Sequence, residues 1–211
     1  SSQDKMFIRF SDQEDLSDYT PTSTNTAGTF QLDDGTRIVG AVKGKDYIIV
    51  FTDTACYLVQ FVGPPFTFSI RKVASNAGLL GQHAAVYANG AVFWMGRTGG
   101  FYVFDGTVKA LDCLVEDFVF TTDGAGDLGL NFDSNELIYA GINELYSEVN
   151  WFYASASSTI IDRVVTYNYA ENVWSTGSLD RTTWEGSTVY QKPFATDFLN
   201  NTQCTYPTIN G

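Results

Sequence analysis

The chain has 211 residues with a formal net charge of −12, and 44% of its residues are hydrophobic. This length is enough for one compact domain with a core of its own and is short for two. With 12 basic residues against 24 acidic ones, the composition excludes a protein that grips duplex DNA through clustered lysines and arginines. The acidity is explained by solubility and repulsion between surfaces or, in a second interpretation, by keeping a passing nucleic acid from sticking.

The three cysteines are odd in number, widely spaced and without a C-x-x-C pair: Cys56, Cys113 and Cys204. This pattern disfavours a disulfide scaffold or a zinc site and favours synthesis in a reducing compartment. No apolar run approaches the roughly 18 residues needed to cross a bilayer, and no signal-peptide pattern opens the chain. We therefore expect no membrane span. The first residue is Ser1, which fits either a processed start or a part of a longer protein.

Residues 1–36 are predicted to be an N-terminal segment that leads into the first of several repeated units. The segment contains a dense acidic cluster: Asp12, Glu14, Asp15 and Asp18. Calcium needs oxygen ligands at such a density, but the D-x-D-x-D-G loop pattern is missing, so no metal site is predicted. Near the end of the segment, Asp33-Asp34-Gly35 predicts a turn.

Three successive units of about four short strands are predicted in the region 37–184. Their apolar blocks are separated by clusters of Gly, Asp, Asn and Thr, which is typical of strands and turns. The first unit has blocks at 38–42, 47–51, 56–62 and 66–73, with Gly63-Pro64-Pro65 ending the third. The second unit has blocks at 84–88, 91–95, 101–104 and 107–111. The third, looser unit has blocks at 137–140, 149–154, 163–169 and 173–179.

Turn signals and a spacing support this repeat. Asn89-Gly90 and Asp105-Gly106 stand between apolar blocks, where such pairs favour tight hairpins. Tyr57 matches Tyr102, 45 residues on, and Tyr102 matches Tyr167 after 65 residues. The excess length lies in the polar stretch 121–136, which includes a predicted turn at Asp123-Gly124-Ala125-Gly126-Asp127.

A repeat of roughly 45–50 residues with four short strands is typical of propeller blades. The predicted fold is therefore all-β: a β-propeller, or part of one, with blades of about four antiparallel strands. Three blades do not normally close a ring, so either the ends of the chain supply further strands or the chain is part of a larger ring. The C-terminal segment 185–211 would close a blade or continue into a longer chain. A sandwich or barrel would contain similar strands but has no reason to repeat them at this spacing.

Catalytic patterns are hard to find in the sequence. His83 is the single histidine, and its loop-like surroundings contain nothing to orient it as a general base. No G-x-S-x-G elbow, P-loop, H-E-x-x-H or strand-linked G-x-G-x-x-G occurs. We predict that the protein is not an enzyme, with no catalytic, cofactor-binding or metal-binding residues. Carboxylates from different blades could still form a glycosidase pair, although Ser178–Trp184 lacks the Gly of the sialidase Asp-box and places its Trp one residue early.

The aromatic fraction of 15% has two interpretations. Aromatic side chains can be stacking platforms for bases or sugars, and Trp94, Trp151 or Trp174 beside clustered carboxylates would serve a glycan. In strands of an all-β fold, large aromatic residues more often form the core between blades. The core interpretation is favoured.

One stretch is more specific than its composition. Phe10-Ser11-Asp12, followed by Asp15 and Tyr19, fits the opening [FW]-S-D-x-x-D-x-x-x-W, with Tyr19 where Trp is commoner. Ile38 to Val42 and Tyr47 to Asp53 then fit a blade with the pattern I-V-G-(hydrophobic)…(L/I)-(I/V)-V-F-(T/K). These segments resemble the β-propeller tail hub (packaged-DNA-stabilisation) and tail nozzle proteins of short-tailed bacteriophages. The resemblance covers residues 7–112 well and 137–184 loosely, and the tail after Trp184 is unmatched.

The resemblance implies a structural virion protein in the tail hub, nozzle or head–tail connector that seals or extends the DNA exit channel. Its expected partners are identical subunits in a ring and neighbouring portal and tail proteins, with DNA passing nearby but not specifically bound. The expected location is the phage tail, after synthesis in the bacterial host cytoplasm. Two other classes stay open: a glycan-binding or glycan-cleaving propeller, and a kelch-like adaptor suggested by Tyr167 to Trp174, which lacks that family's double-glycine strands.

Overall fold

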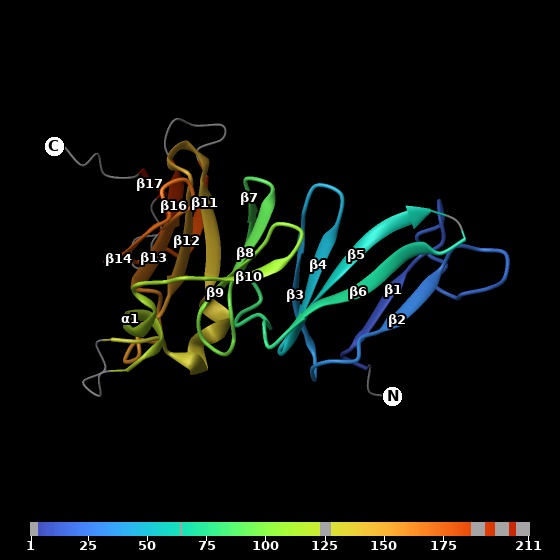
Figure 1. The fold of residues 1–211 in the computed structure, drawn as a ribbon, viewed down its shortest axis with the longest axis horizontal. Helices are drawn as coiled ribbons and strands as arrows, with labels where there is room; N and C mark the ends of the chain where they lie inside the picture. The colour runs from blue at the N-terminus through green and yellow to red at the C-terminus, as the bar shows by residue number, and fades with distance from the viewer. Residues whose placement is uncertain (1–3, 64, 123–127, 187–192, 197–202, 206–211) are drawn as a thin grey trace.

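The structure is a computed structural model that describes residues 4–63, 65–122, 128–186, 193–196 and 203–205. These residues form an N-terminal hairpin followed by four antiparallel sheets, which stand side by side in chain order (Figure 1). The N-terminal hairpin lies at one end of the row, and at the other end the last sheet overlaps the preceding sheet in this view. The fold is all-β, a β-propeller or part of one.

Each of the first three sheets is a blade of four strands that follow one another in the chain. Blade 1 consists of β3 (Ile38–Lys43), β4 (Ile48–Thr52), β5 (Ala55–Gly63) and β6 (Thr67–Ser75). Blade 2 consists of β7 (Ala85–Ala88), β8 (Ala91–Met95), β9 (Phe101–Phe104) and β10 (Val108–Leu111). Blade 3 consists of β11 (Tyr139–Asn143), β12 (Glu148–Tyr153), β13 (Arg163–Asn168) and β14 (Val173–Ser178). The predicted blades of about four antiparallel strands are confirmed.

Strands also come from both ends of the chain. The N-terminal hairpin pairs β1 (Phe7–Phe10) with β2 (Gly28–Gln31). The last sheet, blade 4, has three strands: β15 (Thr183–Glu185), β16 (Phe194–Thr196) and β17 (Gln203–Thr205). Short helical segments lie between the blades and within blade 3: α1 (Glu116–Phe120), η1 (Phe132–Leu137) and η2 (Glu144–Tyr146). No helix in the described part of the chain has the length and apolar character to span a membrane.

The first strands of the four blades lie next to one another, as they do around the axis of a propeller. Contacts join β3 to β7, β7 to β11 and β11 to β15. Between blades 2 and 3, the Ala140 N–H donates to the His83 carbonyl oxygen at 2.7 Å. Glycines permit the close approach at the other two junctions. A Cβ at Gly40 of β3 would lie 2.7 Å from the Gln82 carbonyl oxygen just before β7, and a Cβ at Gly141 of β11 would lie 2.5 Å from the Trp184 side chain of β15.

Large aromatic side chains fill the space between the blades. Trp94 and Trp151 are fully buried in one core that spans blades 1 to 3. Each indole N–H donates to a backbone carbonyl at 3.0 Å: Trp94 to Ala77 and Trp151 to Ala84. These bonds satisfy the polar atom that burial would otherwise leave unpaired. For these two residues, the core interpretation of the aromatic content is confirmed.

Candidate functional site

His83 contacts blade 3 through its backbone. The residue forms a parallel bridge to Tyr139 at the start of blade 3, while its side chain is exposed. Among the described residues, no hydrogen bond or ion pair orients the imidazole. His83 therefore marks the junction of blades 2 and 3, and it lines two of the cavities described below.

The acidic cluster of the N-terminal segment lies in the loop between β1 and β2. The Asp12 carboxylate accepts from the Thr26 N–H at 2.7 Å and from the Thr26 hydroxyl at 2.6 Å. Asp15 accepts from the Ser17 hydroxyl at 2.6 Å, and Asp18 accepts from the Asn25 amide at 2.9 Å. The hydrogen bonds from Thr26 and Ser17 lower the pKa of Asp12 and of Asp15. These hydrogen bonds tie the loop between β1 and β2 together.

Metal and thiol candidates were also located. Among the described residues, no three His, Cys, Asp or Glu side chains are placed to hold a metal ion. Cys56 is a buried free thiol, and Cys113 is a half-buried one. The side chain of Cys204 and the predicted turn at 123–127 lie outside the described residues.

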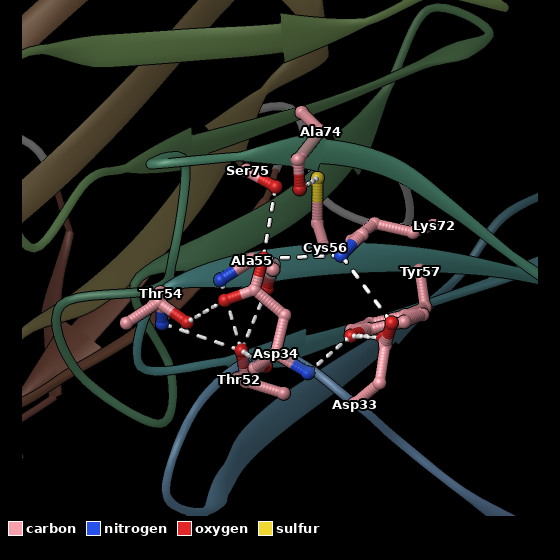
Figure 2. Close-up of polar contacts among 10 residues, drawn as sticks. All are labelled: Asp33, Asp34, Thr52, Thr54, Ala55, Cys56, Tyr57, Lys72, Ala74 and Ser75. Atoms are coloured by element: carbon pink, nitrogen blue, oxygen red, sulfur yellow. Dashed lines mark hydrogen bonds and ion pairs between the residues drawn. The ribbon is translucent and has the colours of Figure 1, made fainter.

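The turn predicted at Asp33-Asp34-Gly35 is the centre of a polar network on blade 1 (Figure 2). We call this network the Asp34 clamp, and its members are Asp33, Asp34, Thr52, Thr54, Tyr57, Lys72 and Ser75. The Asp34 carboxylate accepts from the Thr54 hydroxyl at 2.7 Å and from the Ser75 hydroxyl at 2.8 Å. Lys72 Nζ lies 3.3 Å from the same carboxylate.

The backbone of Asp34 is hydrogen-bonded as well as its side chain. The Thr52 hydroxyl donates to the Asp34 carbonyl oxygen at 2.9 Å, and the Asp34 N–H donates to the Tyr57 hydroxyl oxygen at 2.9 Å. The Tyr57 hydroxyl in turn donates to the Asp33 carboxylate at 2.6 Å. The hydrogen bond from Tyr57 lowers the pKa of Asp33. The clamp therefore ties Asp33 and Asp34, which lie between β2 and β3, to strands β4, β5 and β6 of blade 1.

Three neighbouring cavities lie near the first strands of the blades, which are β3, β7, β11 and β15. Together we call these cavities the inner groove. The largest, about 580 Å³, lies between blades 3 and 4, and its walls include Tyr139, Thr182 and Trp184. A second, about 470 Å³, shares His83 and Glu136 with it. The third, about 490 Å³, shares Glu136 with both and adds Arg97. The three cavities are thus neighbours that share lining residues.

The inner groove combines aromatic rings with polar groups. The Trp184 N–H donates to the Ile142 carbonyl oxygen at 2.9 Å, and its ring packs against Phe152 at a centroid distance of 5.3 Å. The Tyr139 hydroxyl donates to the Arg181 carbonyl oxygen at 2.9 Å, and burial keeps the pKa of Tyr139 far above its usual range. Both rings are held in place, and both stay half-exposed to the cavity. Such a surface can bind a ligand by stacking and hydrogen bonding.

Comparison with known proteins adds little to this geometry. No family model and no curated protein matches the sequence. Among solved structures, Hsv2p of Kluyveromyces lactis is similar at 12% identity and a TM-score of 0.44, covering 81% of this chain and 48% of Hsv2p. The N-terminal domain of Nup159 is similar at 10% identity and a TM-score of 0.38, covering 89% of this chain and 45% of that chain. The chain spans about half the length of these structures, and its fold assignment rests on its own strand order.

The sequence offered no signal for the inner groove. Its lining comes from the ends of separate blades: Arg37 precedes β3, His83 precedes β7, Glu136 lies in η1 and Trp184 lies in β15. These residues share no motif and no spacing. Of the tryptophans considered as sugar platforms, Trp94 and Trp151 are buried and Trp174 donates to the Asp112 carbonyl oxygen at 2.9 Å. None of these three lines the groove.

Proposed function

We propose that the protein is a structural component of a tailed-phage virion, in the tail hub, nozzle or head–tail connector. The observation that carries the proposal is the resemblance of the segment 7–66 to tail hub and nozzle proteins. In the structure this segment runs from the N-terminal hairpin into blade 1, and Asp34 between them is hydrogen-bonded to Thr52 and Thr54. The residues that carry the resemblance are thus neighbours in the fold as well as in the chain.

The charge of the chain supports the same proposal. A formal net charge of −12 repels a phosphate backbone, so DNA would slide past an acidic wall without being gripped. The described ion pairs consume few of the carboxylates: Lys72 with Asp33 and Asp34, Lys109 with Asp105, and Arg181 with Asp180.

The test is co-assembly with the portal protein encoded by the same genome. We expect mass photometry of the two purified proteins to show a ring-sized complex, and negative-stain images to place the added density at the tail side of the portal. A protein that stays monomeric with portal protein present, and that is absent from purified virions by mass spectrometry, would contradict the proposal.

The inner groove favours a second candidate, a glycan-binding propeller. The half-exposed rings of Tyr139 and Trp184 lie beside the hydroxyl of Thr182 and the carboxylate of Glu136 in one cavity. Aromatic faces combined with a few polar groups suit a sugar ring. A glycan array with wild-type protein and Trp184→Ala tests this candidate, and a hydrolase screen separates binding from cleavage. Silence in both assays would remove it.

A further inference from the structure

The hairpin of β5 and β6 ends in an exposed apolar tip. β4 pairs only with residues 56–59 of β5. The rest of the nine-residue strand β5 therefore extends past the end of β4 and pairs with β6 alone (Figure 1). We call its end the tip surface, formed by Phe61, Val62, Pro65 and Phe66. The exposed fractions of Phe61, Val62 and Phe66 are 70%, 53% and 76%. Three large apolar side chains exposed together at one tip mark an interaction site.

Local contacts join the described residues of the tip surface to the rest of the hairpin. The Phe66 N–H donates to the Gly63 carbonyl oxygen at 3.2 Å, which closes the turn, and Gly63 has a positive φ of 77°. At its base, Phe68 packs edge-on against Phe61 and against Phe10 of β1, at centroid distances of 5.7 Å and 4.9 Å. Phe61 would therefore meet a partner from a packed position, which limits the ordering entropy lost on binding.

An acidic loop lies directly beside the tip surface. The Thr67 hydroxyl donates to the Thr26 carbonyl oxygen at 3.4 Å, and Thr26 is bound by the Asp12 carboxylate. The loop 11–27 carries Asp12, Glu14, Asp15 and Asp18 and contains no Lys or Arg. It also exposes Leu16 to 82%. The apolar tip is thus bordered by negative charge.

This charge selects the kind of partner. An anionic lipid surface or a nucleic acid would be repelled by the loop and by the net charge of −12. A second copy of the chain would bring the same net charge. A protein with an apolar pocket bordered by lysine and arginine would gain both the apolar contact and the electrostatic attraction.

We propose that the tip surface is a docking site for a partner protein that presents an apolar pocket bordered by basic side chains. The proposal does not depend on the virion role, because it rests on the tip and on its neighbouring loop alone. In the docked state, Phe61 and Phe66 fill the pocket, and the carboxylates of the loop face the basic border.

The probe is a fluorescent amphipathic peptide with leucines on one face and lysines on the other. We expect it to bind the wild-type chain in fluorescence anisotropy and to shift NMR signals of residues 61–68. Phe61→Ser with Phe66→Ser should weaken binding by about 30-fold, as for loss of a central aromatic anchor. Raising NaCl from about 50 to about 300 mM should weaken the wild-type binding several-fold.

Matched controls distinguish binding at the tip surface from non-specific binding to exposed apolar side chains elsewhere. Leu145→Ser with Tyr146→Ser removes two other apolar side chains, each 61% exposed, and should leave the affinity unchanged. Phe66→Ser alone keeps the packing of Phe61 on Phe68, so its weaker binding cannot be attributed to misfolding.

Four outcomes would overturn the proposal. The first is equal binding by the tip variant, and the second is equal binding of a matched glutamate–leucine peptide. The third is binding of the wild-type chain to phosphatidylcholine vesicles that the tip variant loses. The fourth is self-association in sedimentation that the tip variant abolishes, which would assign the surface to a second copy.

Discussion

Thr52 is a fully buried side chain at the inner edge of the Asp34 clamp. Its hydroxyl accepts from the Ala55 N–H at 2.9 Å and from the Thr54 N–H at 3.2 Å, besides donating to Asp34. Thr52→Val keeps the shape and leaves these groups unpaired, so we expect a loss of about 1–3 kcal/mol in the free energy of unfolding. Urea titration at neutral pH measures it.

The control for this prediction is Thr54→Val, which removes one hydroxyl from an exposed position of the same clamp. We expect a clearly smaller loss from this variant, because water can replace the missing partner. Equal losses from the two variants would show that burial of Thr52 is not what makes its hydrogen bonds matter.

The Asp34 carboxylate gives the clamp a defined pH dependence. Hydrogen bonds from Thr54 and then Ser75 lower the pKa of Asp34 below its usual value of 3.8, against a smaller opposing effect of burial. A carboxyl whose folded pKa is lowered stabilises the fold above its unfolded pKa and loses that contribution as the pH falls through the folded pKa.

We therefore expect the stability difference between wild type and Asp34→Asn to be constant from about pH 5 to pH 8 and to shrink below about pH 4. Urea titrations at several pH values measure this difference. A change centred near neutral pH would contradict the assignment of the effect to this carboxylate.

The β7–β8 hairpin tests turn chemistry at the scale of one element. Asn89 and Gly90 form its two-residue turn with φ values of 48° and 82°. A Cβ on Gly90 would meet no atom within 4 Å, so Gly90→Ala costs only the backbone strain of a positive φ, about 1–2 kcal/mol. The loss should appear as a lower thermal midpoint in calorimetry.

Gly177 in β14 is the matched control, because a Cβ there would make ordinary contact with Val164 at 3.6 Å and no positive φ is needed. Gly177→Ala should be neutral or stabilising by about 0.5 kcal/mol, since it reduces the freedom of the unfolded chain. If both alanines were equally destabilising, strain at the turn would not be the cause.

Strands could be predicted from the sequence because their signals are local. The apolar blocks and the Asn89-Gly90 pair lie within a few residues of each other, and each strand of blades 1 to 3 overlaps a predicted block. The overlap is smallest for β11, because the block 137–140 begins inside η1, and no blocks were predicted for β1, β2 or β15 to β17. Tyr57, Tyr102 and Tyr167, aligned by spacing, all lie on the third strand of their blades. The spacing therefore predicted equivalent positions in successive blades as well as the strands themselves.

The polar clamp and the inner groove could not be predicted, because they depend on pairing between distant segments. Asp34 meets Ser75 across 41 residues, and the β5–β6 register near this contact shifts between Cys56 and Tyr57. Helix α1 was not predicted either, since five residues are too few to show helical periodicity. Tertiary contacts decide such features, and a strand pattern does not contain them.

At the scale of the whole molecule, the blades form a row in which each packs mainly on its neighbours. In such stacked repeats, separate interfaces can open separately. Cys56 reports the interface of blades 1 and 2, because it is buried in their shared core. Burial raises its pKa to about 12, whereas that of the half-buried Cys113 rises to about 11. Reaction with a disulfide reagent therefore requires Cys56 to become exposed first.

We expect Cys113 to react before Cys56 in a Cys204→Ser background at about pH 8. Trp94→Phe removes the hydrogen bond to Ala77 in the same interface and should speed labelling of Cys56 by about tenfold, for a cost near 1.4 kcal/mol. Trp184→Phe loosens the interface of blades 3 and 4 and should leave the Cys56 rate unchanged. Equal acceleration by both variants would mean that the blades open together, as one cooperative unit, and that the row is not a set of separable interfaces.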